Sequence, residues 1–388
     1  MLKAFKYRLY PTSSQAALIN KHIGSVRFLY NLALETKQIA YAGNLINLSR
    51  YDLQVQLKDL KNELIWLKDI NSQSLQVALM NLDAAYLRFF KGQNNFPKFK
   101  SKNRSNQSFN IPQNVNIDFE KNKLFIPKFR EGIKIVLHRK FKGNIKQATI
   151  NKTPTGKYFA SILVDNNIPI PTKKPVKENT TVGIDLGIKS FLVSSDGKTF
   201  KNPKHLRKTQ SKLKYVQCKY SKYKGKRTKY RLALAHEKVI NKRKDFLHKT
   251  STQLIKSHDS IAIEDLNVNG MLKNHNLAQA ITDASWSAFV LMLEYKANWY
   301  GKNILKIGRF EPSSKTCSNC GTINKELQLK DRKWTCKNCG SVLDRDVNAA
   351  INIKNFALKN HLSEGRRLKN RNELPRLRGV LTSEAPCS

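Results

Sequence analysis

Apolar and polar positions alternate in the first ten residues and again later in the first half of the chain. The alternation over Met1–Tyr10 predicts a strand, which Pro11 ends. The same two-residue period returns between Val115 and Val164, with a turn at Thr153–Gly156. We therefore expect a β-barrel or β-sandwich whose first strand is the N-terminal one.

The segment between these two β regions has a helical period. Its apolar residues recur at steps of three and four, which places them along one face of each helix. About three helices are expected from residue 13 to 90, forming a bundle inserted into the β domain, and the polar loop Asn94–Lys102 leads back to the strands. The periodic residues are Ile19, Ile23, Val26, Tyr30 and Ala33, then Leu53, Leu57, Leu60 and Leu64, then Leu75, Leu79, Leu82, Tyr86 and Phe89.

Strands and helices alternate in the second half, which predicts an α/β domain. A stiff linker, Pro169–Pro175, separates it from the first half. The chain after Leu358 is basic and lacks capping signals, so we expect it to be disordered. The expected elements are strands over Val182–Asp185, Ser190–Ser195 and Lys198–Phe200, a long basic helical region over Lys204–Ser257, strand Ser260–Glu264, helix Asp283–Tyr300 and strand Asn303–Ile307.

Charge narrows the range of partners. The 388 residues include 71 Lys and Arg against 28 Asp and Glu, a net charge of +43. Such a surplus points to a long polyanion, and nucleic acid fits better than a small-molecule substrate. No apolar run approaches the ~18 to 20 residues of a membrane span, and Met1–Tyr10 has no apolar signal region. We expect a cytoplasmic protein bound to nucleic acid.

Four of the six cysteines lie within 23 residues, in two Cys-x2-Cys pairs. A glycine follows each pair, and four thiolates brought together in this way satisfy tetrahedral Zn²⁺ with no open position for water. A single structural zinc ion is therefore predicted. The alternative, four buried or disulfide-linked cysteines, is less compatible with a reducing cytoplasm. The predicted ligands are Cys317, Cys320, Cys336 and Cys339.

Three carboxylates occupy positions where their negative charge would be costly unless a bound cation stabilised it. Asp185 and Glu264 each close an apolar strand, and Asp346 begins a predicted helix. Together they could hold two Mg²⁺ ions and hydrolyse a phosphodiester, as in nucleases of the RNase H and RuvC type. Each motif has an alternative: Gly183–Gly187 also resembles an ATPase phosphate loop, Glu264 could cap a turn, and Asp344 or Asp346 could be a plain N-cap.

The order of these motifs resembles the TnpB (OrfB) proteins of bacterial insertion sequences, which are relatives of the type V CRISPR effectors. The resemblance rests on Gly-Ile-Asp-Leu-Gly, Ile-Glu-Asp-Leu, the four cysteines and Asp-Arg-Asp-x-Asn-Ala-Ala-x-Asn-Ile, and it runs from Lys3 to about Lys354. Further matching segments are Lys3–Pro11, Gly24–Asn31, Asn241–Lys249, Leu293–Ala297 and Pro312–Cys317.

The resemblance implies an RNA-guided DNA endonuclease that cuts beside a short target-adjacent motif and promotes retention of its element. Its guide would be a noncoding RNA from the end of that element, and guide pairing would supply most of the sequence specificity. Asp185, Glu264 and Asp346 would be the catalytic Mg²⁺ ligands; Asp346 is chosen over Asp344 because the family motif places the ligand two residues before an Asn, here Asn348. The implied domains are a wedge-like β domain (1–12 and 95–172), a helical recognition insertion (13–94), a RuvC domain (176–311 and 341–358), a zinc ribbon (312–340) and a disordered tail (359–388).

Three regions are candidates for nucleic-acid contacts. Lysines and arginines alternate with tyrosines in Lys204–Lys249, Phe96–Arg104 is similar but shorter, and two glutamines of the third helix lie where the family reads its target-adjacent motif. The alternative in each case is an ordinary solvated helix or loop. The residues are Gln73, Gln76, Phe96, Lys98, Lys100, Lys214, Lys219, Arg227, Lys242 and Arg243.

Other protein classes fit the sequence less well. A DDE transposase would have the acids in the order Asp, Asp, Glu, and a rolling-circle transposase needs a His-x-His pair, which none of the eight histidines forms. A ribonucleoprotein chaperone would keep every activity after Asp185→Ala. The main rival is an RNA-guided DNA-binding repressor; such proteins lose catalytic acids, whereas all three acids remain here.

Overall fold

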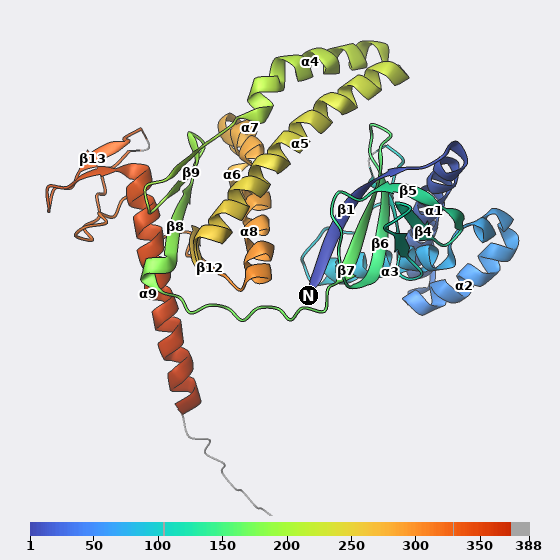
Figure 1. Cartoon of the computed structure of the whole chain (residues 1–388), viewed down its shortest axis with the longest axis horizontal. Helices are drawn as coiled ribbons and strands as arrows, with labels where there is room; N and C mark the ends of the chain where they lie inside the picture. Colours follow the sequence, from blue (N-terminus) through green and yellow to red (C-terminus); the bar gives the residue numbers. More distant parts are fainter. Residues whose placement is uncertain (104, 329, 374–388) are drawn as a thin grey trace, which may run out of the picture. The chain divides into compact units, whose positions relative to one another are not determined.

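The computed structural model describes residues 1–373 apart from 104 and 329. The chain divides into two compact units between Pro169 and Ile170, inside the segment predicted as a linker (Figure 1). Each unit has its own sheet and its own core. Across the described ranges, no helix combines the length and the apolar character that a membrane span requires.

A single seven-stranded sheet forms the first unit, and the N-terminal strand lies inside it. Strand β1 (Leu2–Tyr10) pairs antiparallel with β7 (Tyr158–Asp165) on one side and with β5 (Phe129–Val136) on the other. No ladder joins β2 to β3 in the part of the chain described, so the sheet has two edges and the predicted barrel closure is not observed. The order is β2 (Gln107–Ile111), β6 (Asn144–Lys152), β7, β1, β5, β4 (Lys123–Ile126) and β3 (Asn116–Asp118).

Three α-helices follow β1 in the chain and share a core with the sheet. Thr12 and Ser49 close the first turns of α1 and α2 with capping boxes, which fix where these helices begin. Buried His22 of α1 lies against the rings of Phe109 and Phe129 and accepts the backbone N–H of Asn71, so helices and sheet pack as one body. The helices are α1 (Ser13–Asn44), α2 (Arg50–Glu63) and α3 (Ser72–Phe90), with a 3-10 turn η1 (Ile65–Asp69) before α3.

The second unit is built on a five-stranded mixed sheet in the order β10-β9-β8-β11-β12. Strands β8, β11 and β12 are parallel, whereas β9 and β10 run antiparallel as the predicted meander. Val182, Ile184, Ile261 and Ile263 are buried on one face, as expected for central strands. The strands are β8 (Thr181–Leu186), β9 (Ser190–Ser194), β10 (Thr199–Lys201), β11 (Ser260–Glu264) and β12 (Asn303–Ile307).

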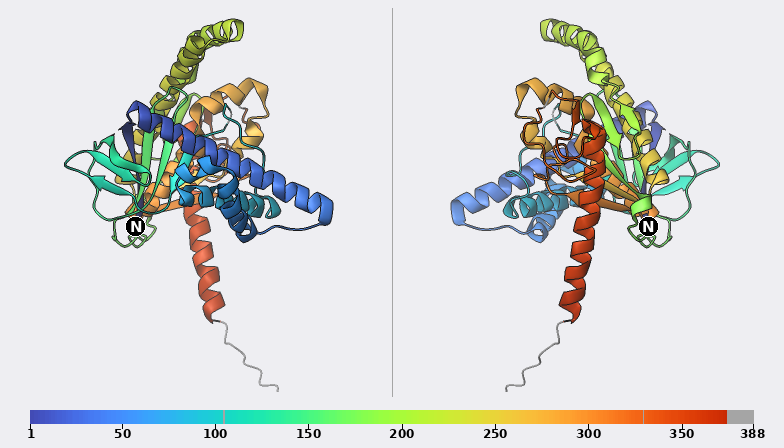
Figure 2. Two further views of the ribbon diagram at one scale, coloured as in Figure 1. Left: turned by 90° about the vertical axis from the view of Figure 1, so that its right-hand side faces the viewer. Right: turned by 90° about the vertical axis from the view of Figure 1, so that its left-hand side faces the viewer.

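Two predicted helical stretches are interrupted by residues in the left-handed conformation. The basic region splits at Lys224 into α4 (His205–Tyr223) and α5 (Lys226–Ser257), which form a two-helix arm reaching beyond the sheet (Figure 2). The predicted helix Asp283–Tyr300 is two helices, because Ser285 has φ 55° and separates α7 (His275–Ala284) from α8 (Trp286–Tyr300). A short helix, α6 (Val268–Met271), precedes them.

The last helix, α9 (Arg345–Glu373), crosses the sheet face opposite α5 and α8 (Figure 1). Its Ile353 and Ala357 pack on Ala262 and Ile307. The tail expected to be disordered after Leu358 is therefore helical as far as Glu373, since extending a packed helix costs much less than starting one. Residues 374–388 lie outside the described part of the chain. Strands β13 (Lys333–Thr335) and β14 (Val342–Asp344) form a small hairpin that contains the second pair of cysteines. The predicted ribbon therefore extends to residue 344, four residues past its expected end at 340.

Candidate active site and metal centre

Two of the predicted catalytic carboxylates end neighbouring parallel strands. Ile184 of β8 is in register with Ile263 of β11, so the next residues, Asp185 and Glu264, lie side by side at the carboxyl end of the sheet. Ile184 and Ile263 are buried on the α8 side, and side chains alternate along a strand, so both acids project toward the α9 side. This edge of a parallel sheet is where active sites of open α/β proteins form.

Gly183 lets α9 approach close enough to bring a third carboxylate to this edge. A Cβ atom at position 183 would lie 2.1 Å from the backbone oxygen of Ala350, a distance that no real side chain tolerates. Two residues span about 6.6 Å along a strand, and four residues, roughly one turn, span about 6 Å along a helix. The step from Gly183 to Asp185 therefore corresponds to the step from Ala350 to Asp346.

The electrostatics of Asp185 agree with this geometry. Burial first, and then the negative charges of Asp346 and Glu264, raise the pKa of Asp185 to about 7. The positive charges of Arg345 and Arg332 oppose this rise. Burial also raises the pKa of Glu264. A carboxylate that is disfavoured by two neighbouring carboxylates is the group that a bound cation would stabilise most.

The structure separates the two aspartates at the start of α9. Asp344 caps the helix, because its Oδ1 accepts the N–H groups of Asp346 at 3.0 Å and Val347 at 3.1 Å. Asp346 has no part in the cap; its carboxylate accepts a hydrogen bond from Arg332 at 3.2 Å and is 26% exposed. The plain N-cap predicted as an alternative thus applies to Asp344, which leaves Asp346 facing the other two acids.

The four cysteines form a compact group that fits a tetrahedral metal ion. All their Sγ atoms lie within 4.8 Å of one another, and the pairs Cys317–Cys339 and Cys320–Cys336 are each 3.6 Å apart. Four sulfurs at ~2.3 Å from zinc would be about 3.8 Å apart, whereas disulfide sulfurs would be at ~2.05 Å. The three carboxylates, all within the described residues, are not gathered this tightly.

Polar neighbours prepare two of these thiols to lose their protons. The hydroxyl of Thr322 lies 3.4 Å from Cys320 Sγ, and the hydroxyl of Ser341 lies 3.3 Å from Cys339 Sγ. Hydrogen bonds from these residues lower the pKa of the Cys320 and Cys339 thiols. Because the thiolate is the metal-binding form, these hydrogen bonds favour metal binding at Cys320 and Cys339. Burial acts in the opposite direction on Cys317 and raises the pKa of its thiol to about 11.

Two buried asparagines tie the segment around Cys317 to α9, and sequence reasoning gave them no such role. Asn348 accepts the N–H of Ser318 at 2.9 Å and donates to the carbonyl of Thr316 at 2.7 Å. Asn352, one turn later, donates to the carbonyls of Ser313 and Thr316. The sequence signal for this role is the four-residue spacing of Asn348 and Asn352, which places both amides on one face of a helix. The first of them follows Asp346 by two residues.

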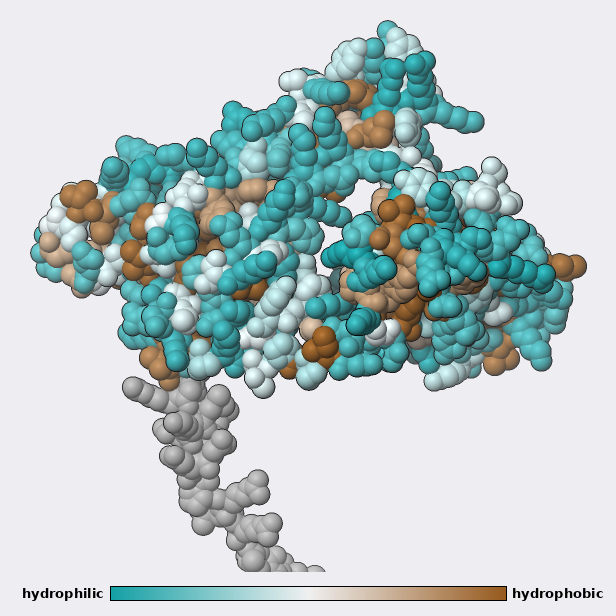
Figure 3. All heavy atoms as spheres, in the orientation of Figure 1, coloured by the Kyte–Doolittle hydropathy of each residue, from teal (hydrophilic) through white to brown (hydrophobic). Residues whose placement is uncertain are grey.

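Most of the predicted contact residues on the α4–α5 arm are exposed cations. Lys214, Lys219, Arg227 and Lys242 point to solvent, and hydrophilic residues cover most of the visible surface of the arm (Figure 3). Arg243 differs, because its guanidinium is 20% exposed and pairs with buried Asp283 at 3.3 Å.

The arm is fixed to the unit through the same aspartate. Asp283 also accepts the backbone N–H groups of Leu206 and Arg207 at the start of α4, where the helix has no side-chain cap of its own. Its carboxylate therefore joins the first turn of α4 to Arg243 of α5. We assign Arg243 to holding the arm rather than to contacting phosphate.

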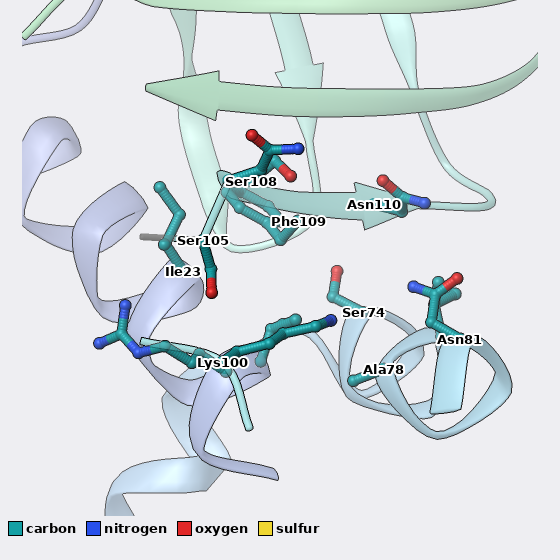
Figure 4. A pocket seen from close by; sticks show the side chains of 13 residues that line it. Ile23, Ser74, Ala78, Asn81, Lys100, Ser105, Ser108, Phe109 and Asn110 are labelled. Carbon is teal, nitrogen blue, oxygen red and sulfur yellow. The ribbon is translucent and has the colours of Figure 1, made fainter. Parts of the chain in front are cut away.

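Of the candidates in the first unit, Lys100 lines a cavity of about 290 Å³ between α1, α3 and β2. Ser74 and Asn81 of α3 point toward β2, and Lys100 extends into the same space (Figure 4). Burial lowers the pKa of Lys100, whose ammonium lies 3.6 Å from the centre of the Tyr30 ring.

The other four candidates of the first unit are not among the residues that line this cavity. Gln73 donates to Gln113 at 2.9 Å, whereas Gln76 and Lys98 are exposed. Phe96 packs edge-on against the rings of Tyr86 and Phe89. The packing of Phe96 leaves it 42% exposed, so part of its ring remains available.

Three protein-family models match the chain. "Helix-turn-helix domain", a model of OrfB proteins, matches residues 1–45, although these residues form a strand and one long helix here. "Probable transposase", also an OrfB model, matches residues 161–275 and includes Asp185 and Glu264. "Cas12f1-like, TNB domain" matches residues 286–353 and includes the four cysteines and Asp346.

Full-length relatives and one solved structure extend these matches. A Streptomyces pristinaespiralis protein named "Putative RNA-guided DNA endonuclease" is 38% identical over 361 residues, which cover 90% of this chain and 88% of that protein. The protein InsQ of Escherichia coli (strain K12), with the same description, is 30% identical and aligned over 91% of both chains. The cryo-EM structure of a Cas12f1–sgRNA–target DNA complex contains a chain that matches with a TM-score of 0.54 and 16% identity, covering 88% of this chain and 83% of that one. At that identity the likeness shows a shared fold.

Proposed function

This chain belongs to the TnpB (OrfB) family, and from that premise we propose that it is an RNA-guided DNA endonuclease encoded by a bacterial transposon. It binds a noncoding guide RNA from the end of its element and cuts double-stranded DNA beside a short target-adjacent motif. It acts in the cytoplasm, at the nucleoid when bound to DNA. The net charge of +43 suits this load of two nucleic acids.

The observation that supports the proposal is the place of Asp185 at one end of a parallel sheet, beside Glu264 and within the influence of the charge of Asp346. Oxygen ligands of this kind suit Mg²⁺, and a pair of Mg²⁺ ions supplies an activated water and a stabilised leaving oxygen in RuvC-type hydrolysis. The three carboxylates would bind and orient those ions. Arg332, which pairs with Asp346, lies where it can stabilise a substrate phosphate.

The other sites take supporting roles. Cys317, Cys320, Cys336 and Cys339 would hold one structural Zn²⁺, which keeps the hairpin rigid beside the carboxylates. Lys214, Lys219, Arg227 and Lys242 on the arm would contact phosphates. In the first unit, Gln73 and Gln76 would read base edges of the target-adjacent motif, with Phe96, Lys98 and Lys100 near the backbone.

The test expresses the chain together with the noncoding end of its gene, purifies the complex and sequences the bound RNA. The complex is then incubated with duplex DNA that carries a guide-matched target next to a randomised flank, in Mg²⁺ or in EDTA. We expect cutting only with Mg²⁺, next to one enriched flanking motif. Asp185→Ala is the inactive control.

Each result has a definite meaning. If a discrete RNA copurifies and DNA is bound but never cut, the protein is an RNA-guided DNA-binding repressor or a decayed nuclease, and the cleavage proposal fails. If no discrete RNA copurifies, guidance by RNA fails as well. Cutting by the Asp185→Ala complex would remove the carboxylates from the mechanism.

A further inference from the structure

Phe310 has the largest exposed fraction among the large apolar side chains in the described part of the chain, at 92%. Single exposed apolar residues are common on protein surfaces and need no explanation by themselves. Phe310 differs in two respects, which are the way its backbone is held and its place beside the carboxylates.

The residues on both sides of Phe310 are anchored. The guanidinium of Arg309 donates to the backbone oxygen and to the carboxylate of Asp265, at 3.3 and 3.4 Å. The carboxylate of Glu311 accepts from Asn360 of α9 at 3.4 Å, and its N–H bonds to the carbonyl of Gly308. The turn between β12 and the cysteine hairpin is therefore tied on two sides while the ring between them stays in solvent.

The turn lies at the same edge of the sheet as the candidate active site. Ile307 of β12 is in register with Glu264, and the N–H of Asp265 bonds to the carbonyl of Ile307. Strands are about 4.8 Å apart, so β12 lies one strand away from Glu264 and two from Asp185. Phe310 follows Ile307 by three residues, so it leaves β12 at the edge of the sheet where the carboxylates lie.

A flat aromatic face that is exposed to solvent matches the chemistry of an unpaired nucleobase. Bases in single strands stack on such rings whatever their identity, whereas the faces of paired bases are covered by their neighbours. We propose that Phe310 is a stacking platform for an unpaired base of the DNA strand that passes through the carboxylate site. The inference rests on the proposed function and names the substrate at that site as a locally single strand.

The test is a coupling measurement on the guide-bound complex of the full chain, in an Asp185→Ala background that prevents cutting. The probe is a single-stranded DNA oligonucleotide complementary to the guide with an unpaired extension, in which one base at a time is removed to leave an abasic site. Phe310→Ala should weaken binding of the intact oligonucleotide by about tenfold, since aromatic stacking contributes on that order per base. At one abasic position this difference between the two proteins should vanish.

Three variants distinguish stacking from packing against protein. Phe310→Trp should bind like the parent protein, whereas Phe310→Leu, which keeps apolar volume without a π face, should bind like Phe310→Ala. Val342→Ala removes another side chain that is 73% exposed, on the cysteine hairpin, and should change nothing.

Three outcomes overturn the inference: equal binding by Phe310→Ala and its parent, a loss that is identical at every abasic position, or recovery by Phe310→Leu. Failure of the proposed function would be recognised by a different result, the absence of Mg²⁺-dependent cutting by the complex with Asp185 intact. A complex that cuts normally without position-specific coupling retains the proposed function and loses this inference.

Discussion

The two candidate metal sites of the second unit are assembled in opposite ways. The cysteine site gathers four donors from 23 consecutive residues, on two short turns followed by Gly321 and Gly340. The carboxylate site gathers three donors from about 160 residues of chain, on two strands and one helix. The first depends on local spacing, whereas the second exists only after the sheet has formed and α9 has packed on it.

This difference determines what each site tolerates. A local site fails when one of its ligands is lost. A site assembled across the fold also fails when the packing that brings its elements together is disturbed, even where no ligand changes. The predictions below test that contrast.

The largest effect is expected at Asp185. Asp185→Ala should lower Mg²⁺-dependent cutting by more than about a hundredfold, because even residues that only support metal ligands account for about 10- to 100-fold. Zinc content should stay unchanged, since the cysteines are a separate site. Asp245→Ala, which removes an exposed acid paired only with Lys249, is the matched control and should cut normally. Loss of zinc from Asp185→Ala would show that the two sites are not independent.

Removal of one cysteine should affect the zinc site strongly and the carboxylate site more weakly. Cys336→Ser should abolish zinc binding, measured as metal per chain by mass spectrometry. It should also lower cutting by about tenfold, because Asn348 and Asn352 of α9 bond to the segment around Cys317. Cys218→Ser, an exposed cysteine on α4 outside the cluster, should retain zinc. Full zinc content in Cys336→Ser would contradict the four-cysteine site.

The charge of Asp185 should make the protein less stable at high pH when metal is chelated. Its folded pKa of about 7 lies above the ordinary value of 3.8, so the folded state favours the protonated carboxyl. The contribution of Asp185 to stability is then greatest below pH 4 and is lost as pH rises from about 4 to 7, at roughly 1.4 kcal/mol per pKa unit. In EDTA, thermal unfolding of wild type relative to Asp185→Asn should show this fall up to about pH 7, and Mg²⁺ should reverse it. Parallel pH curves for the two proteins would refute it.

Gly183→Ala tests whether packing alone can disable the carboxylate site. The new methyl group meets the backbone of Ala350, so we expect a loss of about 1 to 3 kcal/mol in stability together with reduced cutting, while zinc binding persists. Gly24→Ala is the control, because nothing lies within 4 Å of a Cβ there and the residue is inside α1. It should be neutral or stabilising by up to about 1 kcal/mol. Normal cutting by Gly183→Ala would mean that α9 need not approach this closely.

The smallest effect is expected at the helix cap. Asp344→Ala should cost about 1 kcal/mol in unfolding free energy and leave most of the cutting activity, whereas Asp344→Asn, which can still cap α9, should cost less. Asp346→Asn should abolish cutting at little cost in stability. If Asp344→Ala were as inactive as Asp346→Asn, the roles of the two aspartates would have to be exchanged.

The sequence anticipates local features better than assembled ones. Strand Ser260–Glu264 agrees with the structure residue for residue, because burial on both faces produces a continuous apolar run. The bounds of strand Asn303–Ile307 agree as well. Cys-x2-Cys spacing is equally visible. The break at Ser285 is not, since the apolar period continues across a single residue in the left-handed conformation.

Features that depend on contacts between residues far apart in the chain are harder to predict from the sequence. The clash that Gly183 avoids, the buried pairing of Arg243 with Asp283 and the exposure of Phe310 all depend on which element lies opposite. In the sequence Arg243 is one more cation in a basic run, and Phe310 is an apolar residue like any other. Their environments arise from partners at least 40 residues away, which no local pattern encodes.

The central place of β1 governs when the first unit can fold during synthesis. Strand β1 precedes the other elements of the first unit, yet both of its neighbours, β5 and β7, are made more than a hundred residues later. At about 5 to 20 residues per second, the ribosome takes roughly 10 to 30 s to pass from β1 to the end of β7. During that interval β1 has neither pairing partner, whereas α1 to α3 can already form from local contacts. The nascent chain therefore presents folded helices before its sheet can close, and a delay in translation between α3 and β7 would prolong the exposure of an unpaired strand.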